Sequence, residues 1–333
     1  MIGYYAHHQG LGHLQRMRAI ARHLDMPMAV LSSLAAPETF EQEWVPLPMD
    51  NCEPTDDPTA KGTLHWVPRH NAGLRRRMAG IADWINANDP DLVVVDVSVE
   101  VALLCRLMGV PTVVVAMRGD RSDRAHRTAY DSAEALLAPW STEFAEESWP
   151  KSWRDKTFHT GAISRFADRP PTFAPGHAGP PRALVLWGAG GDGRPTDRID
   201  AAIAATPGWD WRVAAVGQDV WDLLSWADVV VTHGGQGAIA EVAAARRPAV
   251  MIAEPRPHGE QSATVRVLAD AGLAVGLQSW PDAAQWPGLL QSALAHGGDQ
   301  WARWAPLDAA QRAAGFLGSA ARNLRTKVAE PVA

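Results

Sequence analysis

The 333-residue sequence has few cysteines and no long uninterrupted apolar run, and each shortage excludes a class of protein. Cys52 and Cys105 are its two cysteines, in unrelated contexts and without metal or redox spacing, so we expect a reduced chain. The longest apolar region, residues 92–117, is interrupted by Asp96, Glu100 and Arg106 and also contains Gly109-Val-Pro111. It therefore cannot span a bilayer as one uninterrupted apolar helix.

Several signals of localisation and chemistry are also missing. Met1 is followed by neither a basic segment nor a signal-peptide apolar stretch, so we expect a cytoplasmic protein. The net charge of −6 argues mildly against nucleic acid as the main partner. The sequence has no P-loop, no H-E-x-x-H zinc motif and no G-x-S-x-G nucleophile elbow.

What is present is a regular alternation of strand-like and helix-like segments. The length and the 47% apolar content suit two globular domains. Continuous β-branched runs separated by helices predict parallel, doubly wound sheets, and therefore an α/β fold with two Rossmann-like domains. The predicted strands are residues 2–6, 28–31, 92–97 and 112–116, then 183–187, 212–216, 229–232, 249–252 and 273–275.

A stretch rich in proline and glycine divides the two series of strands. We predict an amino-terminal domain over residues 1–165, a linker over 166–181 and a carboxyl-terminal domain over 182–333. The last helical stretch, residues 300–327, could pack on either domain, including back on the first. Ligands of open α/β sheets bind outside the carboxyl ends of the strands, so the strand-to-helix turns are the places to look for a site.

Three of these turns are rich in glycine. A helix amino-terminus attracts phosphate, and glycine removes the Cβ that would hold a phosphate away. For any single turn, tight packing is the alternative explanation. The three turns are Gln9-Gly-Leu-Gly-His13, Gly188-Ala-Gly-Gly-Asp-Gly193 and Gly234-Gly-Gln-Gly237.

Glu241 lies four residues after Gly237, on the same face of the predicted helix. A carboxylate there would repel a phosphate, but it could accept hydrogen bonds from a ribose diol beside one, as in dinucleotide sites. A solvated surface glutamate is the alternative.

These residues carry a resemblance to a known family. The run from Asp228 to Glu241, followed by Arg247-Pro248 and Gly259-Glu-Gln261, resembles the donor signature of GT-B glycosyltransferases. Within this group the sequence is similar to the UDP-glucuronosyltransferase-like enzymes and to family 28, which includes the enzyme that adds N-acetylglucosamine to the lipid-linked peptidoglycan precursor. The strong matches cover residues 10–24 and 228–277. Ala245-Arg-Arg-Pro248 departs from the pattern, which has a small residue and a glycine before the proline.

The resemblance implies a nucleotide-sugar donor held by the carboxyl-terminal domain, with UDP-sugar as the first choice and dTDP-sugar as the second. The glycines of the third turn would face the diphosphate, Glu241 the ribose, and Glu260 or Gln261 the sugar hydroxyls. The predicted donor-binding residues are Gly12, Gly190, Gly191, His233, Gly234, Gly235, Gln236, Gly237, Glu241, Glu260 and Gln261.

Transfer to a hydroxyl needs a base, and His13 at the end of the first glycine turn is our candidate. His7 and His8 are its rivals. Asp96 ends a buried strand on the same edge and could orient the imidazole, although it could instead cap the next helix, as could Ser98. One base and a single displacement imply inversion at the anomeric carbon. The glycine turns can stabilise the departing diphosphate, so we expect no metal and no cofactor.

The acceptor side is less specific. We assign Arg16 and Glu100 to it, and the segment from Met49 to His70 fits no recognisable pattern. A cell-envelope lipid, a polysaccharide end or a small natural product would each suit as acceptor. The basic clusters Arg75–Arg77 and Arg118–Arg127 could touch acidic lipid headgroups at the inner face of the membrane, or could be solvated helix faces.

Four other functions compete with sugar transfer. A dehydrogenase could use the G-x-G-x-x-G at Gly188–Gly193, but Arg194-Pro195 delays the helix and no acidic residue ends the next strand. An esterase lacks its nucleophile motif. A nucleotide-sugar epimerase of the same architecture is the stronger rival, because fold alone does not decide function. A binding protein without catalysis is the more distant one.

Overall fold

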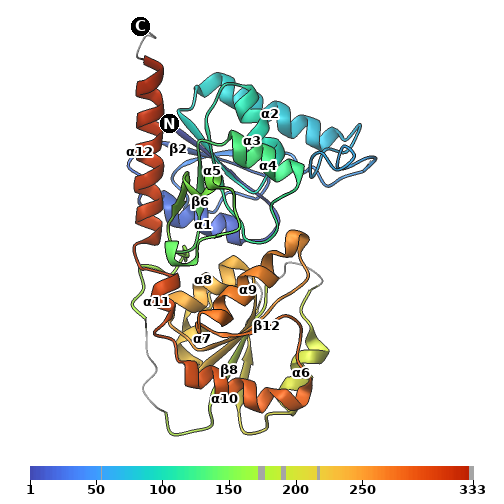
Figure 1. Cartoon of the computed structure of the whole chain (residues 1–333), viewed down its shortest axis with the longest axis vertical. Helices are drawn as coiled ribbons and strands as arrows, with labels where there is room; N and C mark the ends of the chain where they lie inside the picture. Colours follow the sequence, from blue (N-terminus) through green and yellow to red (C-terminus); the bar gives the residue numbers. More distant parts are fainter. Residues whose placement is uncertain (54, 172–176, 189–192, 216–217, 330–333) are drawn as a thin grey trace.

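The computed structural model describes residues 1–53, 55–171, 177–188, 193–215 and 218–329, and Figure 1 shows them as two α/β units joined at a narrow waist. The amino-terminal unit contains a seven-stranded sheet in the order β3-β2-β1-β4-β5-β6-β7. The carboxyl-terminal unit contains a five-stranded sheet in the order β12-β11-β10-β8-β9. Neighbouring strands of both sheets run parallel, so the predicted fold class is confirmed.

The strands of the first sheet are short, and the central ones are fully buried. They are β1 (Ile2–Ala6), β2 (Met28–Ser32), β3 (Glu43–Pro46), β4 (Leu92–Asp96), β5 (Thr112–Val115), β6 (Ala135–Ala138) and β7 (Thr157–His159). The helices that connect them are α1 (Gly12–Ala21), α2 (Ala72–Asn88), α3 (Val99–Leu107), α4 (Arg124–Ser132) and α5 (Lys151–Arg154).

The second unit repeats the same alternation. Its strands are β8 (Arg182–Leu186), β9 (Asp210–Val213), β10 (Val229–His233), β11 (Ala249–Ile252) and β12 (Val275–Leu277). Its helices are α6 (Thr196–Ala204), α7 (Trp221–Trp226), α8 (Gln236–Ala244), α9 (Glu260–Asp270), α10 (Trp286–His296) and α11 (Trp301–Trp304). The last helix, α12, spans Ala309–Ala329.

Helices cover both faces of each sheet, because parallel strands are apolar on both sides. In the first unit, α1 and α12 pack on one face, and α2, α3 and α4 cover the other. In the second unit, α7, α8 and α9 cover one face, while α6 and α10 cover the other. The core made by α7, α8 and α9 continues through Phe166 and Trp304 into that of the first unit, so the waist is packed.

The chain crosses the waist twice. It leaves the first unit after β7, and it returns through α11 to α12, which runs along the amino-terminal unit (Figure 1). The crossing segments are hydrogen-bonded to each other, because Ala162 donates its amide to the carbonyl of Trp304 at 2.9 Å. Three short strands, β3, β6 and β7, were not predicted from the sequence. None of the described helices combines the length and the hydrophobicity that a bilayer span requires.

Candidate active site

A cleft of about 460 Å3 lies at the waist and is lined by both units. The first unit contributes the turn after β1 and the start of α1, including Gly12 and His13. The second contributes the turn after β10, the start of α8 and the start of α9. The carboxyl ends of the strands of both sheets therefore open onto one space, as the parallel topology predicts.

His13 and Asp96 meet at this cleft. The Nδ1 atom of His13 is 2.8 Å from Oδ1 of Asp96, which is fully buried, while the His13 side chain is 16% exposed. Burial alone would raise the pKa of Asp96, but Arg16 and then His13 hold this pKa well below its usual range. An ionised carboxylate only accepts hydrogen bonds, so this contact needs a proton on Nδ1 of His13, and the neutral ring with that proton has its lone pair on Nε2.

Asp96 is the centre of a larger polar group. It accepts hydrogen bonds from the Tyr4 hydroxyl at 3.0 Å and from two nitrogens of Arg16 at 3.0 and 2.9 Å. The cap of α3 is Ser98, whose hydroxyl accepts the amide of Val101 at 3.2 Å. A helix-capping role therefore does not account for the buried position of Asp96 at the end of β4.

Arg16 connects the two units. Its third nitrogen donates to Oε1 of Gln236, at the start of α8, at 2.7 Å. The side chain is 7% exposed and fully engaged with Asp96 and Gln236, although it does line the cleft. This geometry makes Arg16 a brace between the proposed base and the second unit.

His7 and His8, the rivals of His13, have different surroundings. Burial, together with His13 and His8, lowers the pKa of His7 to about 3. Burial and Arg77 also lower the pKa of His8. A lowered pKa makes each of these imidazoles a weaker general base, His7 above all.

The starts of α1 and α8 face each other across the cleft. A Cβ added to Gly237 would lie 3.5 Å from Cα of Gly12, and one added to Gly12 would lie 4.0 Å from the amide nitrogen of Gly237. Helix amino-termini carry unpaired N–H groups and about half a positive charge each. Their joint position creates a pre-formed site for an anion between the two units.

The other two glycines of this turn have a different explanation. A Cβ on Gly235 would lie 2.4 Å from Cε1 of His233, and one on Gly234 would lie 2.8 Å from a methyl of Val265. The amide of Gly235 donates to Nδ1 of His233 at 2.9 Å, which fixes the turn. Tight packing within the chain thus accounts for Gly234 and Gly235, whereas Gly237 lies against Gly12 of the other unit.

The predicted donor carboxylates also line the cleft. Glu241 forms an ion pair with Nε of Arg165 at 2.7 Å, and burial raises the pKa of the Glu241 carboxyl. Burial likewise raises the pKa of Glu260. Gln261 is buried, and its amide oxygen accepts the backbone amide of Glu254 at 3.0 Å.

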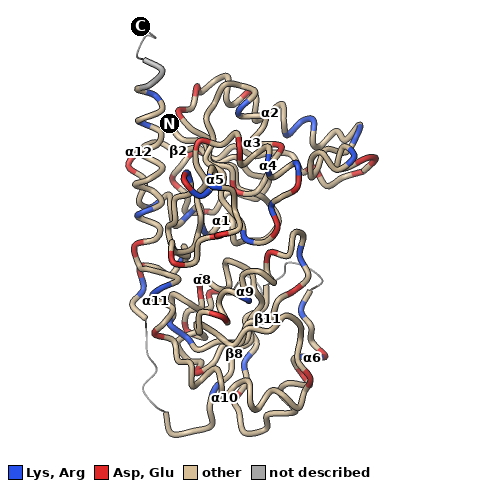
Figure 2. Tube along the Cα trace, viewed as in Figure 1, with Lys and Arg blue, Asp and Glu red and all other residues tan. Residues whose placement is uncertain are grey.

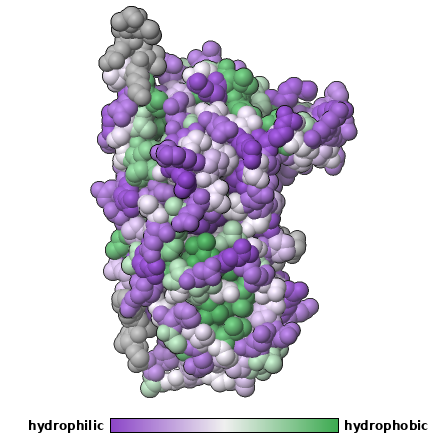
Figure 3. All heavy atoms as spheres, viewed as in Figure 1, coloured by the Kyte–Doolittle hydropathy of each residue, from purple (hydrophilic) through white to green (hydrophobic). Residues whose placement is uncertain are grey.

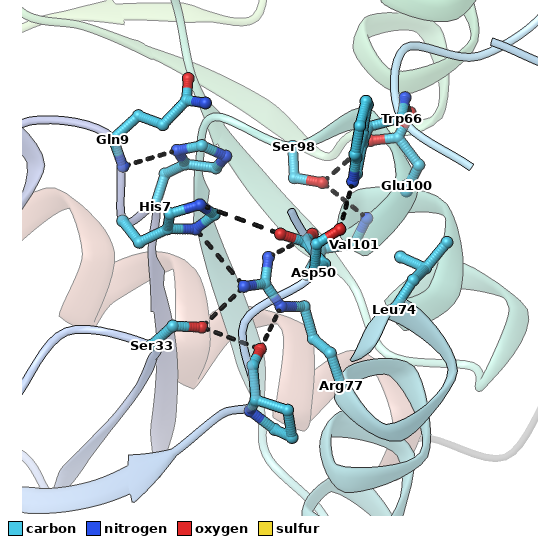
Figure 4. Close-up of polar contacts among 12 residues, drawn as sticks. His7, Gln9, Ser33, Asp50, Trp66, Leu74, Arg77, Ser98, Glu100 and Val101 are labelled. Carbon is cyan, nitrogen blue, oxygen red and sulfur yellow. Dashed lines mark hydrogen bonds and ion pairs between the residues drawn. The ribbon is translucent and has the colours of Figure 1, made fainter. Parts of the chain in front are cut away.

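Glu100 lies in a separate polar region beneath the segment that precedes α2. Its carboxylate accepts the backbone amides of His65 and Trp66 at 2.7 and 3.0 Å. Figure 4 shows Glu100 beside Trp66, and it shows Arg77, which donates to Asp50 at 2.6 Å. Glu100 is therefore an anchor for the 51–70 segment and is not among the residues described as lining the cleft.

The basic clusters are only partly available to a partner. Arg77, Arg118 and Arg121 are 1%, 1% and 4% exposed, so these three cannot reach lipid headgroups. Figure 2 shows charges of both signs interspersed along both units. In Figure 3 the projecting 51–70 segment is mostly hydrophilic, and apolar surface gathers on the carboxyl-terminal unit below the waist.

Some sequence predictions fall elsewhere. Gly190 and Gly191 lie outside the described residues, so only Gly188 and Gly193 of the second glycine turn are described. The sequence also missed contributors to the cleft, above all Arg165 and Arg256. Arg165 directly precedes the predicted linker. A positively charged residue at the junction of two domains with a ligand site between them was the signal that could have identified it.

Comparisons with known proteins agree with this geometry. Residues 210–294 match the model of the glycosyltransferase family 28 C-terminal domain. The chain is 37% identical over 83 residues to the UDP-N-acetylglucosamine–N-acetylmuramyl-(pentapeptide) pyrophosphoryl-undecaprenol N-acetylglucosamine transferase of Nitratidesulfovibrio vulgaris. The enzyme of the same name from Chromohalobacter salexigens is 34% identical over 85 residues. Each match covers 25% of this chain and 23% of the relative, so it spans about a quarter of either protein.

Solved structures extend the likeness to the whole chain at the level of the fold. The glycosyltransferase of kitacinnamycin superposes with a TM-score of 0.67 at 17% identity, covering 98% of both chains. MurG of Acinetobacter baumannii superposes with a TM-score of 0.62 at 15% identity, covering 96% of this chain and 99% of the other.

These findings define the class first. The chain has the two-domain GT-B architecture of glycosyltransferases. Its carboxyl-terminal unit carries a glycosyltransferase family 28 C-terminal domain, and the resemblance noted in the sequence is confirmed.

Proposed function

We propose that this protein is an inverting, metal-independent glycosyltransferase that moves a sugar from a nucleoside diphosphate sugar to a hydroxyl acceptor. The observation that carries the proposal is the pair of His13 and Asp96 at the edge of the cleft, 2.8 Å apart. With Nδ1 held by the carboxylate, Nε2 of His13 removes the proton of the acceptor hydroxyl as that oxygen attacks the anomeric carbon. Asp96 stabilises the imidazolium that forms.

The departing diphosphate is stabilised by the opposing starts of α1 and α8. Their backbone amides and helix dipoles are fixed before the substrate arrives, so no reorganisation is needed as charge develops on the leaving oxygen. The absence of a Cβ at Gly12 and at Gly237 lets the two helix starts lie close together, which supports their joint action on the diphosphate. A single displacement on one face of the sugar inverts the anomeric carbon.

The second unit holds the donor. Glu241 accepts hydrogen bonds from the ribose diol, and Glu260 and Gln261 meet the sugar hydroxyls. UDP-sugar is the first choice because the named transferases that match part of this chain carry UDP-N-acetylglucosamine in their names. A dTDP-sugar is the second choice, because a structural neighbour, a rhamnosyltransferase, is described in complex with thymidine diphosphate.

The acceptor is a hydroxyl compound bound on the amino-terminal side, near Arg16. A lipid-linked acceptor would bring the protein to the inner face of the membrane. The names of the matched transferases, which include pyrophosphoryl-undecaprenol, support testing this class beside soluble polysaccharide ends and small natural products.

The test is incubation of the protein with a panel of nucleotide sugars, with and without acceptors of the three classes. Release of nucleotide together with a glycosylated product of inverted configuration by NMR supports the proposal. Conversion of the donor to an isomeric nucleotide sugar would favour the epimerase instead. Binding of NADH without binding of any nucleotide sugar would refute both.

A further inference from the structure

Three histidines and an aspartate gather outside the cleft. Among the described residues, His65, Asp123, His126 and His258 form a group in which one nitrogen or oxygen atom of each lies within 4.8 Å of all the others. His65 comes from the segment before α2, and Asp123 and His126 from the start of α4. His258 comes from the turn before α9, in the other unit.

The distances in the group are those of a small polar cage. The Asp123 carboxylate lies 3.0 Å from Nε2 of His65, 2.5 Å from Nδ1 of His126 and 3.6 Å from Nδ1 of His258. Zinc–nitrogen and zinc–oxygen bonds of about 2.0–2.2 Å put the ligand atoms of a tetrahedral site about 3.4 Å apart. The three carboxylate contacts differ from this spacing by less than an ångström, and ligand atoms as far as 4.8 Å apart would have to approach by up to about 1.4 Å to hold an ion.

One carboxylate cannot satisfy three imidazoles by ion pairing. The three rings lie close together, with centroids 4.4, 4.6 and 5.2 Å apart. Like-charged imidazolium rings at such distances would repel one another, whereas neutral imidazoles turn lone pairs to a shared cation. The four side chains are 11–33% exposed, so an ion can reach them from solvent.

Each member is held in place by other contacts. Asp123 is the cap of α4 and accepts the amide of His126 at 3.1 Å. The amide of His65 is held by Glu100, as described above. The carbonyl of His258 accepts the amide of Asp120 at 2.8 Å.

The backbone of His258 is the most informative feature. It has a φ of 62°, a left-handed conformation that a residue with a Cβ adopts at some cost. Such strain persists where the surroundings hold it, and it concentrates at ligand sites and clamps. Here it turns the imidazole of the second unit toward the three residues of the first.

We propose that His65, Asp123, His126 and His258 bind one divalent transition-metal ion of the zinc class, and that this ion clamps the two domains together. Imidazole and carboxylate ligands in a four-coordinate set favour zinc over magnesium or calcium. Binding through Nδ1 of His126 leaves the ring proton on Nε2. The contact of 3.3 Å between Nε2 and the Arg121 guanidinium must then lengthen.

The bound ion would affect residues of the cleft although it lies outside the cleft. None of the four side chains is among the residues described as lining the cleft, but Arg256 and Glu260, on either side of His258, are. An ion that fixes His258 would therefore fix the start of α9. Its effect on donor binding rests on the proposed function, whereas binding of the ion does not.

The test uses tag-free, chelator-treated protein titrated with Zn²⁺ by calorimetry, and with Co²⁺ by visible absorption. We compare wild type with His65→Gln, Asp123→Asn and His258→Asn. The asparagine at 258 tolerates the left-handed backbone. His23→Gln, at an exposed histidine outside the group, is the matched control. Thermal unfolding without metal checks that every variant is folded.

The expected result is one ion per chain in wild type and in His23→Gln, with tetrahedral Co²⁺ bands and at least tenfold weaker binding in each of the three variants. Zn²⁺ should also slow hydrogen exchange over residues 256–261 in wild type. Absence of binding, or equal binding in the three variants, would overturn the site. Binding that His258→Asn leaves intact would overturn the clamp. Since the readouts need no donor or acceptor, a failed transferase assay does not bear on them.

Discussion

The two units meet the cleft with different chemistry. The amino-terminal sheet brings an ionisable network to its edge, in which a buried aspartate holds His13 and Arg16. The carboxyl-terminal sheet brings a glycine turn and the backbone amides of α8, with Glu241 set beside them. In the proposed function, proton transfer and donor binding are therefore separable, because the first depends on side chains of the first unit and the second mainly on the backbone of the second unit.

The largest expected effect separates the two roles. His13→Ala should lower the rate of sugar transfer by roughly 10²–10⁴, the range for loss of a general base. Affinity for UDP should stay near wild type, because the proposed function has the other unit bind most of the nucleotide. The rate is measured at saturating donor and the affinity by calorimetry, with His23→Ala as control. Full transfer activity in His13→Ala would remove the proposed base.

Asp96→Asn should lower transfer by as much as His13→Ala or less, because Asp96 acts through the imidazole. The double variant should be little slower than His13→Ala alone, since the residues work as one unit. If the rate losses of the two single variants instead multiply in the double variant, Asp96 does not act through His13, although His13 could still be the base.

The Asp96→Asn variant also leaves the Arg16 charge buried beside a neutral group, so its unfolding must be measured alongside its rate. Tyr4→Phe is the companion variant. It removes another hydrogen bond to Asp96 while leaving the contact with His13 intact.

Glu241→Ala tests the donor side. It should weaken UDP binding by about 1–3 kcal/mol, the range for hydrogen bonds to charged groups. Calorimetry measures the affinity, and Glu147→Ala, at an exposed glutamate, is the control. An unchanged affinity would leave Glu241 as no more than the partner of Arg165.

Two glycines of one turn sharpen the comparison further. Gly235→Ala should destabilise the fold by about 1–3 kcal/mol, because the new Cβ would strike the His233 ring. Gly237→Ala meets only an ordinary contact with Gly12 and gains helix propensity, so its stability should hold or rise. Yet its donor affinity should fall, because the methyl would lie between the two helix starts, where the diphosphate is proposed to approach. Urea unfolding and calorimetry distinguish the variants, and equal affinity in Gly237→Ala and wild type would contradict that approach.

The smallest expected effect is a loss of folding stability as the pH falls. Burial and then Arg256 lower the pKa of His233 to about 4, below the value of about 6.5 for an unfolded chain. The unfolded state therefore binds more protons between these values, and the stability due to this group is lost as the pH falls through that window. Between pH 7.5 and 5.5 the loss should be about 1 kcal/mol. Urea unfolding of His233→Asn, which keeps an acceptor for Gly235, should show a smaller loss, and an equal one would contradict the assignment.

The fold followed from the sequence where strands are buried on both faces. Ile2–Ala6 and Ala249–Ile252 are continuous apolar runs and were predicted to the residue. The missed strands are short, and β3 is partly exposed and ends in a proline, so periodicity carries little signal there. The pairing of His13 with Asp96 was predictable because both end or follow parallel strands.

The sequence could not show which structural role a particular residue has. A glycine that avoids His233 and a glycine that faces a ligand look the same in a sequence. Arg246, where relatives of this pattern have a small residue or glycine, adopts a φ of 53° and donates to the carbonyl of Ala305 at 2.9 Å. This bond to Ala305, far along the chain, gives a structural reason for an arginine at position 246. A local sequence pattern could not have revealed it.

The return of α12 to the first unit also governs the order of events on the ribosome. Its residues Ala309, Ala313 and Leu317 pack on the face of β1, β2 and β4 that carries Ile2 and Tyr4. Those strands are translated early, but their cover is made only after the whole second unit. At about 5–20 residues per second, the stretch between the end of β4 and the start of α12 takes roughly ten to forty seconds, during which that apolar face has no cover from α12. The nascent amino-terminal half therefore exposes this face until the last helix emerges.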